Sequence, residues 1–400
     1  MVELKEPFNY FRSFLKLPKD IKLILFSNLF SSIQYGLFAV IQTLYLKSLG
    51  YNPPTIGLLV GLTPMLSMFF LIPSGVIANR FGKKWLLVVS GLAYLSSFMI
   101  YATLDAFHFL LLASLLGGLS WGVYVAPFQA IIADNVETAK RSYAYSLSSF
   151  LFSFGLIIGS LVAGLKEILE STFHLPPIFS YRLMFWFLVA IGIASVVPLI
   201  PIKEESRVDA KAKSYFTIKS WRSIGKLTLF QGLIGLGSGF FVVLLPLYLN
   251  MKFSALEVEI GVLLAVSNAV TGISYLAAPK LIEMMGSVRS IVLSQSIAVL
   301  LLVLIPLSPS FEVAALLYSA RTMLMNFASP IISTYTTELV ERNEVALTSG
   351  VTATAWNGAN AVSTMVAGQI MGTNLDLPPY LCGLTYALSI MLFYFFFKGD

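Results

Sequence analysis

Long apolar runs separated by short polar breaks dominate this 400-residue sequence and restrict what it can fold into. Only 12% of its residues are Asp, Glu, Lys or Arg, compared with about 25% in typical soluble domains. A soluble core cannot absorb this much apolar surface, so we expect the lipid bilayer to be the solvent. Runs of about 18 or more apolar residues predict an all-α integral membrane protein with twelve transmembrane helices. The predicted spans are 20–47, 54–78, 85–104, 107–132, 141–166, 179–200, 223–250, 256–282, 288–306, 311–337, 345–372 and 379–397.

The longest hydrophilic interruption, residues 201–222, falls near the middle of the chain and divides the spans six and six. We therefore expect a cytoplasmic interfacial segment at 1–19, a six-helix bundle at 20–200, a cytoplasmic linker at 201–222 and a second six-helix bundle at 223–400. The first segment interleaves Phe with Arg and Lys, as interfacial segments do.

The distribution of basic residues predicts the orientation. Most of the 26 Lys and Arg residues fall on the side that holds both termini and the linker. The opposite side holds Lys47, Lys166, Arg182 and Lys252. By the positive-inside rule, a multi-pass protein of the cell membrane with both termini in the cytoplasm is expected.

The two halves repeat each other. The sequence IGLLV at 56–60 returns as IGVLL at 260–264, and other landmarks recur at the same offset. An even number of spans in each half gives both copies one orientation, which predicts a pseudo-twofold axis along the membrane normal. The paired landmarks are Gly82 with Gly286, Asn79 with Glu283, and Asp134 with Glu338.

The most specific motif is GVIANRFGKK at 75–84, between the second and third spans. Twelve spans, a parallel repeat and this basic glycine turn together resemble the major facilitator superfamily. The resemblance implies two bundles that rock about a central site, with this motif and its copy closing the cytoplasmic side. The alternative is that these charges only set the orientation. The residues assigned to gating are Gly75, Asn79, Arg80, Gly82, Lys83, Lys84, Asp134, Arg141, Glu283, Gly286, Arg289 and Glu338.

Polar residues at helical spacing on one face of several spans indicate a water-filled cavity, because such groups are penalised when they face lipid. The alternative is hydrogen bonding between helices, which amides and hydroxyls often provide in membranes. The expected substrate-binding residues are Asn28, Tyr35, Gln42, Trp121, Tyr124, Asn268, Tyr275, Arg321, Asn326, Trp356, Asn357 and Asn360.

Arg321 lies near the middle of its predicted span, where an arginine costs about 2.5–3.5 kcal/mol on insertion scales. No predicted span contains an equally central acid. Three interpretations follow: Arg321 binds an anionic substrate, it hydrogen-bonds carbonyls and amides such as Asn326 or Asn357, or it reaches an acid at a helix end and gates the pathway.

Together these observations predict a secondary active or facilitative transporter of a small organic solute, with a slight preference for an organic anion because of Arg321. The alternatives are an exporter of drug-like or lipid-like amphiphiles and a non-transporting receptor on the same fold. We expect no enzymatic activity, cofactor, metal or nucleic acid, and we expect a monomer in contact with lipid. Coupling to an ion stays open, because no central carboxylate or histidine supplies a proton relay.

Overall fold

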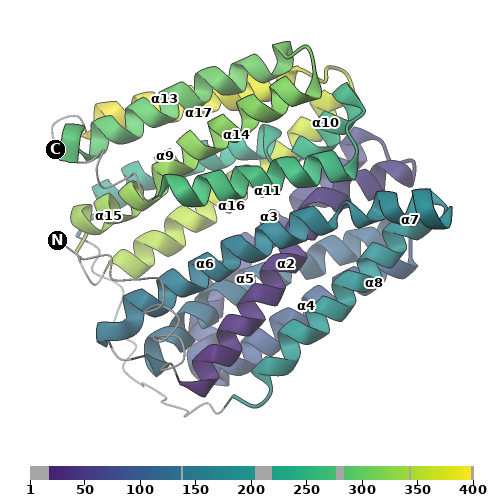
Figure 1. The fold of residues 1–400 in the computed structure, drawn as a ribbon. Helices are drawn as coiled ribbons and strands as arrows, with labels where there is room; N and C mark the ends of the chain where they lie inside the picture. Colours follow the sequence, from purple (N-terminus) through teal and green to yellow (C-terminus); the bar gives the residue numbers. More distant parts are fainter. Residues whose placement is uncertain (1–17, 137, 203–218, 276–282, 342–343, 398–400) are drawn as a thin grey trace.

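The computed structural model describes residues 18–136, 138–202, 219–275, 283–341 and 344–397. Long helices run side by side along one direction, and α2 begins at the end of the bundle where α17 finishes (Figure 1). We call the opposite end of the bundle the outer end. The helices of the first half are α2 (Lys19–Ser48), α3 (Pro53–Phe81), α4 (Lys83–Thr103), α5 (Phe107–Asn135), α6 (Thr138–Val162), α7 (Leu165–Phe173) and α8 (Pro177–Val196), followed by the 3-10 turn η1 (Val197–Leu199).

The second half repeats this arrangement after the linker. Its elements are α9 (Trp221–Phe241), α10 (Leu245–Phe253), α11 (Glu257–Ser274), α13 (Ser287–Leu304), the 3-10 turn η2 (Ile305–Leu307), α14 (Phe311–Phe327), α15 (Ser329–Leu339), α16 (Val345–Met371) and α17 (Leu377–Phe397).

Ten stretches of the described chain are long and apolar enough to cross a membrane. The two remaining predicted spans are also helical. The span at 311–337 is divided at Ala328 into α14 and α15, and the span at 345–372 is the single helix α16, whose Thr, Ser and Asn residues lower its hydropathy. The all-α, twelve-helix architecture predicted from the sequence is therefore confirmed.

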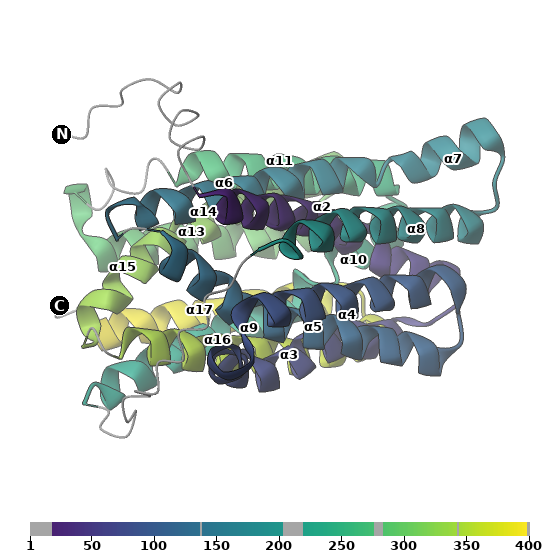
Figure 2. The same ribbon diagram turned by 90° about the horizontal axis from the view of Figure 1, so that it is seen from below.

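Helix packing follows the repeat. In the first half, α2 packs against α6 and α8, and in the second half α9 packs against α16 and α17. The pairs α3–α5 and α4–α8 have their counterparts in α11–α14 and α13–α17. Between the halves, α3 packs along α16 and α6 along α11, and Figure 2 shows α11 lying beside α6 and α7. These matched pairs are the packing that a pseudo-twofold axis requires.

Small residues allow helices to approach closely, both between the two halves and within each half. A Cβ atom built on Gly57 of α3 would lie 2.7 Å from the Cα atom of Gly368 on α16. Gly155 and Gly159 of α6 similarly face the backbone of α2, and Gly235 of α9 faces Trp356 of α16. The glycine-rich segments at 155–164 and 235–239 therefore serve close helix packing, as small residues do in membranes.

The two equivalent loop glycines share one backbone conformation. Gly82, between α3 and α4, has φ +95°, and Gly286, before α13, has φ +80°. Side chains disfavour this left-handed region because the Cβ atom approaches the backbone. The glycine turn predicted from the sequence is thus present in both halves.

Substitution of Gly286 by alanine should lower the free energy of unfolding by about 1 kcal/mol, because the positive φ becomes strained. Nothing lies within 4 Å of the added Cβ atom, so the loss would report on the backbone alone. Thermal unfolding in detergent is the measurement. Gly225→Ala is the matched control, because Gly225 also has open space but lies within α9. A Gly286→Ala variant as stable as wild type would contradict the prediction.

Candidate functional site

A cavity of about 530 Å³ lies at the centre of the molecule, between the two halves. Helices α2, α4 and α5 form most of its wall, with smaller contributions from α3, α6, α9, α11 and α16. Its volume is in the range of pockets that hold drug-sized ligands. The structure therefore contains a cavity where polar faces of helices from both halves lie together.

An aromatic surface covers the first-half side of this cavity. The ring of Tyr35 stacks on Trp121 with centroids 5.6 Å apart, and Trp121 lies 6.4 Å from Tyr124. Phe152 of α6 approaches Tyr35 at 6.4 Å. Stacked rings of this kind present flat apolar faces with polar edges, which suits aromatic ligands.

Hydroxyl and amide groups form the rest of the wall. Gln42 donates to the hydroxyl of Tyr101 at 3.1 Å, and that hydroxyl lies 3.3 Å from Ser114 Oγ. On the opposite side, Ser67 donates to Asn357 at 3.2 Å, which links α3 to α16. Asn268 of α11 lines the cavity without a hydrogen bond inside the described part of the chain, so its amide is available to a ligand.

The cavity wall is uncharged. Among the described residues that line it, none is Lys, Arg, Asp, Glu or His. A charged ligand would therefore lose its hydration without gaining an ionic partner, which is costly. The geometry favours a neutral molecule with aromatic and hydrogen-bonding groups.

Most residues expected to bind substrate do line this cavity, although their role in binding stays a prediction. The cavity-lining members are Tyr35, Gln42, Trp121, Tyr124, Asn268, Trp356, Asn357 and Asn360. The serines that complete the wall were not among the predicted binding residues. A serine is common in any membrane helix, so only the packing distinguishes those that face the cavity.

Four expected residues lie elsewhere: Asn28, Asn326, Tyr275 and Arg321. Asn28 is buried behind the aromatic surface, where it donates to the carbonyl of Ser148 at 3.0 Å and accepts from Tyr124 at 3.1 Å. Asn326 lines a second, smaller cavity in the second half. Tyr275 lines neither of the two cavities.

Arg321 also lines neither cavity. Its side chain is buried inside the second half, where the guanidinium donates to the hydroxyl of Tyr386 at 3.0 Å. The guanidinium carbon also lies 5.2 Å from the ring of Tyr386 and 5.8 Å from that of Tyr318. This arrangement matches the interpretation in which Arg321 fastens helices together, with a tyrosine on α17 in place of the amides considered from the sequence.

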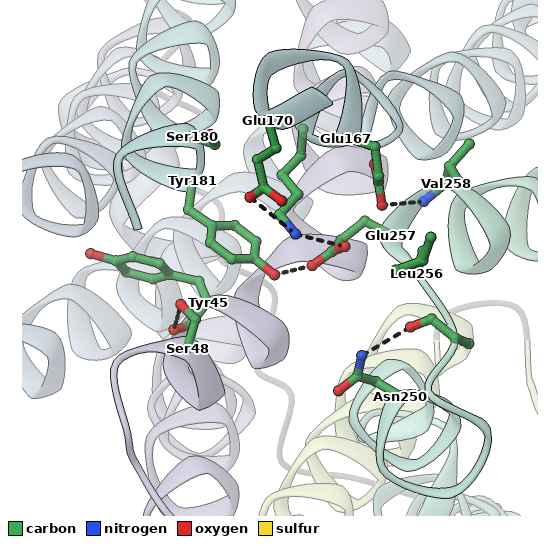
Figure 3. A network of polar contacts seen from close by, with 12 residues as sticks. Tyr45, Ser48, Glu167, Glu170, Ser180, Tyr181, Asn250, Leu256, Glu257 and Val258 are labelled. Carbon is green, nitrogen blue, oxygen red and sulfur yellow. Dashed lines mark hydrogen bonds and ion pairs between the residues drawn. The ribbon is translucent and has the colours of Figure 1, made fainter. Parts of the chain in front are cut away.

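A buried polar network, which we call the outer latch, joins the halves at the outer end. Its members are Lys166 and Glu167 of α7 and Tyr181 of α8 in the first half, and Glu257 and Val258 of α11 in the second (Figure 3). The ammonium of Lys166 lies 3.2 Å from Glu257, Tyr181 donates to the same carboxylate, and Val258 N–H donates to Glu167 at 3.1 Å.

Further contacts close the same end. Lys47 of α2 donates to the side chain of Asn250 on α10 at 2.6 Å, again across the two halves. Lys166 also lies 3.2 Å from Glu170, so two carboxylates, one from each half, share a single ammonium group. The structure is therefore closed at its outer end.

The residues expected to gate the opposite end are only partly placed. Lys83 forms an ion pair with Asp134, and Lys84 donates to the carbonyl of Ile200 at 2.5 Å, so both tie elements of the first half together. Glu283 and Arg289 are exposed, and Gly75 packs near Ala126. The side chains of Asn79, Arg80, Arg141 and Glu338 lie outside the described part, and their gating role stays a prediction.

Glu257 was not among the residues predicted from the sequence. It is 3% exposed at the start of α11 and pairs with a lysine 91 positions earlier. Lys166, one of few cations predicted on the outer side, was the sequence feature that could have indicated a buried acidic partner. A lone cation near the end of an apolar span needs a partner.

Comparison with known proteins identifies the family. The model of the Major Facilitator Superfamily matches residues 24–364. The quinolone resistance protein NorA of Staphylococcus aureus (strain MRSA252) is 21% identical over 377 residues, covering 91% of this chain and 92% of that protein. Multidrug resistance protein 1 of Bacillus subtilis (strain 168) is 22% identical over 397 residues, covering 94% and 96%. A crystal structure of a variant of the nucleoside transporter NupG superposes with TM-score 0.76 at 14% identity, covering 94% of this chain and 100% of that one.

Proposed function

The chain belongs to the major facilitator superfamily, and from that premise we propose that it transports uncharged, aromatic, amphipathic organic molecules by alternating access. Membership makes it a multi-pass membrane transporter and not an enzyme. The observation that carries the proposal is the central cavity, whose aromatic and hydroxyl-bearing wall holds no charged residue among those described. Such a wall rewards flat apolar surface and hydrogen bonding over net charge.

The relatives support drug-like substrates and favour export; the preference for uncharged solutes rests on the cavity wall alone. The names of the two bacterial relatives attach quinolone and multidrug resistance to those proteins, which is the behaviour of exporters of drug-like molecules. The organic-anion preference formed from the sequence rested on Arg321, and the position of that residue against Tyr386 gives it less support. An exporter of amphiphiles, the alternative from the sequence, is therefore the preferred function.

The proposed function also requires a particular orientation of the chain in the membrane. We propose that both termini and the linker at 201–222 are cytoplasmic, that the segment at 1–19 lies at the membrane surface, and that bundles 20–200 and 223–400 move as the rocking units. In that orientation the outer latch faces outside, and the molecule closes its external side. We propose a monomer as the transporting unit, and coupling to an ion stays open.

Flux into proteoliposomes tests the function. Three solutes with one aromatic body should be compared: a neutral amide, the carboxylate and the primary ammonium. We expect the neutral solute to be transported at least about tenfold faster than either ion, because neither ion finds a counter-charge in the cavity. Faster flux of the carboxylate would overturn the proposal in favour of anion transport. Binding without flux of any solute would favour the receptor alternative.

Trp121→Ala provides the residue-level test. Loss of the stacked ring should reduce neutral-solute flux about tenfold, since an aromatic contact and its buried area contribute about 1–2 kcal/mol. Trp186→Ala is the control, because Trp186 is exposed on α8 outside the cavity. Equal flux in the two variants would remove Trp121 from the site.

A further inference from the structure

A second cavity of about 230 Å³ lies within the second half. It is bounded by α9, α13, α14, α15 and α16, and it shares only Trp356 with the central cavity. Three carboxamide side chains line it: Gln231 of α9, Gln295 of α13 and Asn326 of α14. We call this cavity the amide pocket.

The three amides of this pocket lack partners. Gln295 is 2% exposed, and its Oε1 atom is buried with no donor in the described part of the chain. The side chains of Gln231 and Asn326 likewise make no hydrogen bond to any other described residue. A buried polar group without a partner costs roughly 1–3 kcal/mol, and natural proteins usually satisfy it. Gln231 and Asn326 are half-buried, so this cost falls on Gln295.

Fully buried amides elsewhere in the described part of the chain have hydrogen-bond partners. Asn28 donates to Ser148, Gln34 donates to the carbonyl of Leu188 at 2.9 Å, and Asn360 donates to the carbonyl of Gly235 at 3.3 Å. These amides join helices. The three amides of the pocket join nothing and surround one empty space, which is the arrangement expected of groups that bind a ligand.

The wall defines the ligand's chemistry. Each carboxamide offers two N–H donors and one carbonyl acceptor, so a matching ligand carries both donors and acceptors. Among the described residues of the wall none is charged, and Phe230, Ile234 and Trp356 add apolar and aromatic surface. The volume is below that of pockets for drug-sized molecules, so the ligand is small.

We propose that the amide pocket is a second binding site, separate from the central cavity, for a small neutral molecule that carries a urea, amide or similar donor–acceptor group beside an aromatic or apolar body. The site does not depend on the proposed transport function. Trp356 forms part of the wall of both cavities. Through this residue, a ligand bound in the amide pocket would affect the central cavity.

Equilibrium dialysis of radiolabelled phenylurea against the purified full-length protein in detergent tests this site. Wild type should bind phenylurea saturably. Gln295→Leu and Asn326→Leu should each weaken binding about fivefold or more, as expected for the loss of a hydrogen bond in a buried site. Gln369→Leu should leave binding unchanged, because Gln369 is exposed on α16 outside both cavities.

Two further measurements test the role of Gln295 and the separation of the two cavities. Without ligand, Gln295→Leu should melt at or above the wild-type temperature, because it removes an unsatisfied buried amide. A variant that melts lower would show that Gln295 is structural, and would overturn the proposal. Phenylurea binding should also survive Trp121→Ala, which alters only the central cavity. Loss of binding in that variant, or no saturable binding in wild type, would equally overturn it.

Discussion

Replacement of Lys166 by methionine should destabilise the outer-closed conformation by about 3–5 kcal/mol, the range seen when one partner of a buried ion pair is removed. Lys166 supplies the ammonium shared by Glu170 and Glu257, and it is 8% exposed. Without it, the carboxylates of Glu170 and Glu257 would face one another across the two halves. Mutual repulsion and the lost hydrogen bond to Glu257 both favour separation of α7 from α11.

Distances between spin labels at the outer end measure this shift. Labels at Thr103 of α4 and Thr373, just after α16, lie on exposed positions of opposite halves. In Lys166→Met the distribution should move to longer distances, with the outer-closed population falling at least about a hundredfold relative to open states.

The controls separate the latch from a general effect of removing a lysine. Lys219→Met breaks an exposed pair with Glu341, 3.2 Å apart, and should change stability by less than about 1 kcal/mol. Adding Glu257→Met to Lys166→Met should restore part of the closed population, because it removes one of the unpaired carboxylates. A distance distribution in Lys166→Met that equals wild type would exclude the latch as a determinant of outer closure.

The features that the sequence predicted well depend on local patterns. Apolar runs predicted the spans because a bilayer accepts only segments of one length and polarity. Gly82 and Gly286 predicted equivalent turns because few residues other than glycine adopt their positive φ readily. The polar face of α2 predicted a cavity because helical spacing places Tyr35 and Gln42 on one side.

The features that the sequence did not predict depend on how helices are rotated in the bundle. Arg321 occupies mid-span as expected, yet helix packing turns it towards Tyr386 and away from the cavity. Glu257 pairs with Lys166 only because α11 lies beside α7. The unpartnered state of Gln295 is also invisible to a pattern, since Gln34, a similar residue in a similar helix, has a partner.

We propose that the central cavity selects neutral solutes because its wall carries no charge among the described residues. Asn268→Asp tests this directly, because it places a negative charge on the wall. Asn268 lines the cavity from α11 without a hydrogen bond inside the described chain, so the substitution breaks no described contact. A carboxylate there would attract a cationic solute by a few kcal/mol at an effective dielectric constant of about 20. It would also repel an anion and bind water more tightly, which slows a neutral solute.

Two variants serve as controls for this substitution. Asn374→Asp adds the same charge in an outer loop, where the new side chain keeps an oxygen to accept from Asp376 N–H. Asn268→Leu removes the amide without adding charge. Neither should change the ratio of cation to neutral flux by more than about twofold, because neither places a charge in the cavity.

The decisive measurement is the ratio of ammonium to neutral-amide flux in proteoliposomes at pH 7.5, for solutes that share one aromatic body. We expect Asn268→Asp to raise this ratio at least about a hundredfold over wild type, with both controls unchanged. An unchanged ratio in Asn268→Asp, or a wild-type protein that already prefers the cation or the carboxylate, would contradict selection of neutral solutes by an uncharged cavity.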